Sequence, residues 1–199
     1  APPMPDNVRA VIANRLDLLD PADRAVLQAA AVVGMQFWPG AVATAVGQPV
    51  EEVERTLLRL EQRDLVEERG NSSMAGQLEY AFRHVLVRDV CYQRLPRAER
   101  VARHERTADW LERVSAGRQT DLAEVLANHR WAAHEIARTL GLDPGPYAAP
   151  AREALLRAAR RAYSLHALDA AQELVRRAST LLAAPDPAVD LFAAELAFF

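Results

Sequence analysis

His84 stands where two patterns of different period meet. Before it, Leu78, Tyr80 and Phe82 alternate as on a strand, and after it apolar residues recur at helical spacing as far as Tyr92. A polar side chain held between a strand and a helix is well placed to meet a group that approaches the surface. The alternative is a histidine that caps its own helix or bonds to the backbone, and spacing alone favours that alternative.

Other arrangements that carry chemistry are not found in the sequence. No phosphate-binding loop of the GxxxxGK[ST] type, no GxGxxG and no GxSxG occurs. Cys91, the single cysteine, falls on an apolar helical face, which favours a buried, inert thiol. His129 and His134 lie about 140° apart around a helix and lack the HExxH pattern. We therefore expect no catalysis and no metal site.

The composition is that of a helical protein. Half of the 199 residues are hydrophobic, and only 6% are aromatic, which favours helices over sheets. The net charge of −3 gives no electrostatic case for binding nucleic acid or an anionic membrane. A lone cysteine and the lack of an apolar span or signal pattern lead us to expect a cytoplasmic protein. The chain starts without Met and ends in an apolar run, so we expect it to be part of a larger protein.

The first half of the chain has the element order of a winged helix. Helical patterns cover about residues 6–19, 21–33, 40–46 and 51–63, and strand patterns cover 65–69 and 78–83, with a turn-rich loop between the strands. Three small helices followed by a two-stranded hairpin predict this fold. We assign residues 21–95 to it and residues 1–20 to a linker helix from an ATPase domain outside this chain.

A winged helix often binds DNA through its third helix. Here the segment 51–63 carries more carboxylates than arginines, and the loop 70–77 has no basic residue. Contact with phosphates needs positive charge, so the sequence argues against binding to DNA. A DNA-binding regulator with a helical effector domain remains the alternative.

The second half of the chain is helical throughout. Helices are expected at residues 97–114, from a capping box at Thr120 to Leu140, and in an alanine-rich pair that begins at Pro150, divides near His166 and closes at Pro185. Residues 141–146 form the clearest linker. We assign residues 96–143 to a helical hairpin region and 147–199 to truncated tetratricopeptide-like (TPR-like) repeats.

The TPR-like assignment depends on a 34-residue window that starts at Arg152. Small residues stand where such repeats pack closely, and a large apolar residue stands where one is needed: Ala159, Ala171, Ala178 and Leu155. Ala162 occupies an aromatic position, with Tyr163 beside it. An unrelated helical hairpin, or a free-standing protein-interaction scaffold, remains open. The complete prediction is a mainly α protein: a winged helix followed by an α-helical TPR-like superhelical region.

Three stretches carry a family resemblance. Residues 8–19 and 29–34 resemble the start of the winged-helix domain of bacterial STAND-type signalling ATPases, AAA-related regulators found with adenylate or guanylate cyclase domains or with LuxR-type DNA-binding domains. Residues 82–92 are more specific and resemble the "MHD" segment of the related NB-ARC and NLR switch proteins. Arg83-His84-Val85 occupies that triplet and keeps only its histidine.

The resemblance implies a function for His84. It would face the nucleotide of the ATPase domain outside this chain and bond to the β-phosphate of ADP, with Arg83 and Arg88 as further phosphate contacts. An imidazole can donate to a phosphate oxygen, and a rigid junction would couple nucleotide state to the winged helix. The chain itself would hold no cofactor, whereas its parent would bind ADP or ATP with Mg. The helical repeats would bind an inducer or a protein partner, and oligomerisation is possible.

Overall fold

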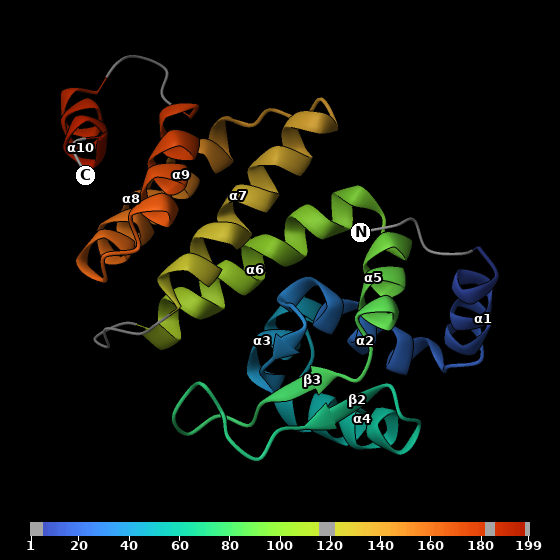
Figure 1. Cartoon of the computed structure of the whole chain (residues 1–199). Helices are drawn as coiled ribbons and strands as arrows, with labels where there is room; N and C mark the ends of the chain where they lie inside the picture. Colours follow the sequence, from blue (N-terminus) through green and yellow to red (C-terminus); the bar gives the residue numbers. More distant parts are fainter. Residues whose placement is uncertain (1–5, 116–121, 182–185, 198–199) are drawn as a thin grey trace. The chain divides into compact units, whose positions relative to one another are not determined.

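The computed structural model describes residues 6–115, 122–181 and 186–197, which form ten helices and three short strands. The expectation of a mainly α protein is confirmed (Figure 1). The chain divides into two compact units, Ala1–Trp110 and Leu111–Phe199, and the division falls inside helix α6, Arg97–Ser115. Of the helices that the structure describes, none has the length and apolar character needed to span a membrane.

The N-terminal unit alternates helices with short strands. Its elements are α1 (Asp6–Asp17), α2 (Pro21–Val33), β1 (Gln36–Phe37), α3 (Pro39–Val46), α4 (Val50–Gln62), β2 (Val66–Glu68), β3 (Tyr80–Phe82), α5 (Val85–Arg94) and the first part of α6. Local chemistry explains the helix limits. Pro21 and Pro39 start α2 and α3, where a missing N–H costs nothing, and Gly47 ends α3 in the left-handed conformation at φ 77°.

The three strands form one antiparallel sheet in the order β1-β3-β2. The sequence predicted the β2–β3 hairpin but missed β1, because two residues are too short to show an alternating pattern. The central strand β3 is buried at all three positions. Phe37 of β1 packs on Tyr80 and Phe82 of β3, with ring centroids 6.2 and 5.4 Å apart.

Helix α2 forms the centre of this unit. It contacts α3, α4 and α5, and its buried residues include Val26, Leu27 and the run 29–33. Alanines in that run let neighbouring helices approach closely, while each buried valine or leucine contributes about 1.5–3 kcal/mol.

Arginine side chains add long-range hydrogen bonds to this core. Arg24 donates to three carbonyl oxygens at the end of α1, those of Leu16, Asp17 and Leu19. From α6, Arg103 donates to the carbonyl oxygen of Ala25 and Arg106 to that of Ala45. The planar guanidinium suits this use, because it offers several donors in a fixed fork.

The C-terminal unit is a succession of helices, each packed on the next. It contains the end of α6 and α7 (Ala123–Thr139), α8 (Gly145–Ser164), α9 (Leu168–Ser179) and α10 (Pro187–Ala197). Helix α8 contacts both α7 and α9, and α9 contacts α10. Small buried residues line these contacts: Ala127, Ala133, Ala137, Ala151, Ala154, Ala158, Ala171 and Ala178.

One helix start differs from the predictions. Helix α8 begins at Gly145 instead of Pro150, so the predicted linker loses its last two residues and Pro150 lies inside the helix. The Asp143 side chain accepts a hydrogen bond from the N–H of Gly145, and Pro146 fits the first turn, so the helix can begin early. The capping box predicted at Thr120 and the closing Pro185 lie outside the described residues, and α7 is described from Ala123. The break near His166, which has φ 60°, is confirmed.

Candidate functional site

The backbone around His84 is fixed on both sides. Upstream, the N–H of Phe82 donates to the carbonyl oxygen of Met35, and the N–H of Arg83 donates to that of Leu65. Downstream, α5 is anchored by three buried side chains, Val87, Val90 and Cys91. His84 itself is extended, with φ −137° and ψ 128°, and is the residue from which α5 starts. The predicted strand–helix junction is therefore present.

The imidazole of His84 is exposed and makes no capping hydrogen bond to α5. The structure thus contradicts the interpretation in which His84 caps its own helix. Among the described residues, no hydrogen-bond or ion-pair partner is found for this side chain, so both ring nitrogens are available to a ligand.

The first turn of α5 adds two further donors beside His84. The carbonyl oxygen of His84 accepts from the N–H groups of Val87 and Arg88, but within the described chain the N–H groups of Val85 and Leu86 have no acceptor. This turn contains no acidic residue. A helix start with free N–H groups carries partial positive charge and favours anions.

Arg83 and Arg88 both have partners within the N-terminal unit. The Arg83 guanidinium lies 3.6 Å from a carboxylate oxygen of Asp64 and 3.8 Å from one of Glu67. Arg88 donates to the carbonyl oxygen of Ala31, 3.1 Å away near the end of α2, and to the carboxylate of Asp89, 3.0 Å away. Of the three residues predicted to face a phosphate, His84 is thus the one for whose side chain no partner is found among the described residues.

Arg88 also helps to fix α5. Helix α2 has no basic residue in its last turn, and the guanidinium of Arg88 supplies a donor and a positive charge there. Arg88 and Arg100 both lie over the ring of Tyr92, at 5.2 and 4.6 Å from its centroid. The Tyr92 hydroxyl is 3.0 Å from Nε2 of His104 on α6. The helix that follows His84 is therefore tied to both α2 and α6.

The other residues that the sequence offered for catalysis or metal binding, Cys91, His129 and His134, are buried in helices. Burial raises the pKa of the Cys91 thiol to about 12, so the thiolate is scarce near neutral pH. His129 and His134 are both buried in α7, and His134 packs on Trp131 with ring centroids 5.9 Å apart. No group of three or more metal-ligating side chains occurs within the residues described.

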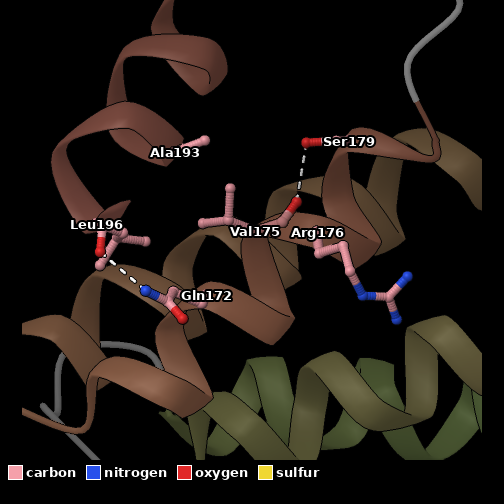
Figure 2. A pocket seen from close by; sticks show the side chains of 6 residues that line it. All are labelled: Gln172, Val175, Arg176, Ser179, Ala193 and Leu196. Atoms are coloured by element: carbon pink, nitrogen blue, oxygen red, sulfur yellow. Dashed lines mark hydrogen bonds between the residues drawn. The ribbon is translucent and has the colours of Figure 1, made fainter. Parts of the chain in front are cut away.

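A pocket of about 310 Å³ lies between α9 and α10 (Figure 2). Its walls carry apolar and polar side chains: Gln172, Val175, Arg176, Ser179, Ala193 and Leu196. The Gln172 amide donates to the carbonyl oxygen of Leu196, and the Ser179 hydroxyl donates to that of Val175 (Figure 2). Within the described chain, no donor is found for the Oε1 atom of Gln172, and the Ser179 hydroxyl keeps a lone pair that can accept a hydrogen bond. No sequence pattern indicates this pocket, because it is formed only where two helices pack together.

The chain was compared with protein-family models, with curated proteins and with solved structures. None of them matches.

Proposed function

We propose that this chain is the regulatory arm of a STAND-type signalling ATPase, with no catalytic activity of its own. In this proposal the N-terminal unit senses the nucleotide held by an ATPase domain of the parent protein, and the C-terminal unit binds an inducer or a protein partner. One observation carries the proposal: an exposed imidazole without a described partner stands at a helix start with two free N–H groups, on a backbone fixed from both sides.

The element order supports the winged-helix part of this proposal. Helix α2, strand β1, helices α3 and α4, and strands β2 and β3 follow one another as in a winged helix, and β3 lies between β1 and β2. The loop between β2 and β3 is also anchored as a defined wing. The buried carboxylate of Glu79 accepts from the N–H and the hydroxyl of Ser73, and the side chain of Met74 is buried.

The proposed ligand of the junction is the β-phosphate of ADP. His84 would donate one hydrogen bond, and the N–H groups of Val85 and Leu86 would supply two more. Arg88 would act as a positioning residue, because its donors are used on Ala31 and Asp89. Arg83 could reach a phosphate only by leaving Asp64 and Glu67.

The pocket between α9 and α10 is the proposed place for a small inducer. Its volume falls at the lower end of the range for ligand sites, and most of its exposed lining is apolar. An uncharged, largely apolar molecule with a hydrogen-bond donor for Gln172 or Ser179 fits this lining.

The exposed side of helix α4 has no excess of positive charge with which to bind DNA. Its exposed positions include two glutamates and two arginines in the first three turns: Glu51, Glu52, Arg55 and Arg59. The Arg59 guanidinium lies 2.6 Å from the buried carboxylate of Asp23, which neutralises it. A phosphate backbone needs a net positive surface, so the nucleotide-sensing function is favoured over DNA binding.

The direct test is the nucleotide content of the parent ATPase. We expect the purified wild-type protein to release ADP on denaturation, and the His84→Ala variant to release much less. The control is His166→Asn, which changes an exposed histidine in the C-terminal unit to a residue that tolerates its left-handed backbone. Equal ADP content in His84→Ala and wild type would contradict the proposal.

A further inference from the structure

Helix α1 presents an exposed apolar and basic face. Val11 and Leu18 lie seven residues apart, so they share one side, and they are 61% and 81% exposed. Arg15 lies between them on the same side. The opposite side of the helix carries the buried Leu16.

A pocket of about 280 Å³ opens at the end of this face. It is lined by Arg15, Leu18, Leu19, Arg63 and Leu65. Arg15 donates to the carbonyl oxygen of Arg63, which fixes the two arginines beside each other. Within the described chain, no hydrogen bond or ion pair is found for the Arg63 guanidinium. The pocket therefore joins an apolar floor to positive charge at its rim.

Two of the three aspartates next to this pocket in the sequence form ion pairs with other arginines. Asp17 pairs with Arg94 at 2.6 Å, and Asp64 pairs with Arg83 at 3.6 Å. Asp20 is exposed and lowers the positive charge at one edge of the surface. We call Val11, Arg15, Leu18, Arg63 and Leu65 the α1 face.

Helix α10 presents the opposite chemistry. Its exposed residues Asp190, Leu191, Ala194 and Glu195 fall within about 140° of the helix circumference, and we call them the α10 face. Leu191 is 63% exposed, and the helix contains no basic residue. Among the described residues, neither Asp190 nor Glu195 has an ion-pair partner. The α10 face is thus an apolar centre flanked by negative charge.

We propose that the α10 face of one copy of this chain docks on the α1 face of a second copy. Leu191 enters the pocket beside Leu18 and Leu65, and Asp190 and Glu195 pair with Arg15 and Arg63. The two faces differ, so the contact is head-to-tail and allows further copies to add. This proposal does not depend on nucleotide binding at His84.

The small size of the two faces indicates how tightly two copies of the chain should bind. Each face offers four or five side chains, far fewer than the roughly 20–30 residues on each side of a stable interface. We therefore expect weak association that is seen at high protein concentration and is reduced by salt.

Sedimentation velocity over a concentration series of the chain tests the proposal. We expect the weight-average sedimentation coefficient of the wild type to rise with concentration. Arg63→Glu alone and Glu195→Arg alone should each stay monomeric, because each places like charges opposite one another. An equimolar mixture of the two variants should associate again, since every contact between unlike copies is then complementary.

Two further variants keep the test decisive. Arg97→Glu makes the same charge change at an exposed position of α6 that is not part of the α1 face, and it should associate like the wild type. Leu18→Ser changes a side chain that is almost fully exposed, so it should abolish association without affecting the fold. A wild type that stays monomeric at every concentration, or a mixture that does not associate, would overturn the proposal.

Discussion

The contacts inside the N-terminal unit differ from those inside the C-terminal unit in the sequence separation of the residues they join. In the N-terminal unit, hydrogen bonds join residues that are far apart in sequence, such as Arg88 with Ala31 and Arg103 with Ala25. In the C-terminal unit, each helix packs on the next. Some ion pairs there join residues three or four positions apart, such as Glu173 with Arg176, and others join different helices, such as Arg157 with Glu112.

This difference suggests different mechanical roles. A unit tied by long-range contacts responds as one block, so a change at His84 would be felt by α2 and α6. A stack of neighbouring helices can change locally, as a partner-binding region must.

Cavity-forming substitutions in the two cores should lower the free energy of unfolding equally. They should differ in how many helices then exchange amide hydrogens faster. Leu27 and Leu155 are both fully buried, so Leu27→Ala and Leu155→Ala should each lower the free energy of unfolding of their unit by about 3 kcal/mol. Hydrogen exchange should rise together across α2, α3, α4 and α5 in Leu27→Ala. In Leu155→Ala it should rise mainly in α8 and its neighbours α7 and α9. Uniform protection loss throughout the C-terminal unit would contradict the contrast.

The two partners of the Asp23–Arg59 ion pair should differ in how much stability is lost when each is removed. Asp23 is almost fully buried, whereas the Arg59 side chain is 51% exposed. Arg59→Met leaves a buried carboxylate without its cation and should cost about 3 kcal/mol near neutral pH. Asp23→Ala leaves an arginine that water can reach, and should cost about 1 kcal/mol. Urea unfolding of the two variants measures this, and equal losses would show that burial does not govern the pair.

The smallest effect is expected at Glu173 in the C-terminal unit. Hydrogen bonds from Arg176 and Arg177 lower the pKa of Glu173 to about 2 from a usual 4.5. A lowered carboxylate pKa gives stability that is present above pH 4.5 and is lost as the pH falls toward 2. The group is exposed to solvent, so the loss should be slight. Thermal unfolding from pH 5 to pH 2 should show a slightly smaller acid-induced decrease in Glu173→Gln than in wild type.

Much of the fold followed from local signals in the sequence. Pro21 and Gly47 mark helix limits, and the change of period at His84 marks a strand–helix junction, because these features act through the backbone of neighbouring residues. Strand β1 was missed because two residues carry no pattern, and α8 began early because an Asp143 side chain stabilised its start.

The candidate site was predictable only in part. The position of His84 came from the sequence, but its exposure and the engagement of Arg83 and Arg88 depend on tertiary contacts with Asp64, Glu67 and Ala31. Neither pocket had a sequence signal, since each is lined by residues from separate elements.

The most direct measurement is the rate at which a fluorescent ADP leaves the parent ATPase. A hydrogen bond to a charged phosphate contributes about 1.5–3 kcal/mol, so His84→Ala should release ADP roughly 10–100 times faster than wild type. His84→Gln, which keeps a donor, should fall between them, and His166→Asn should match wild type. Equal rates in His84→Ala and wild type would contradict the account in which His84 senses the nucleotide.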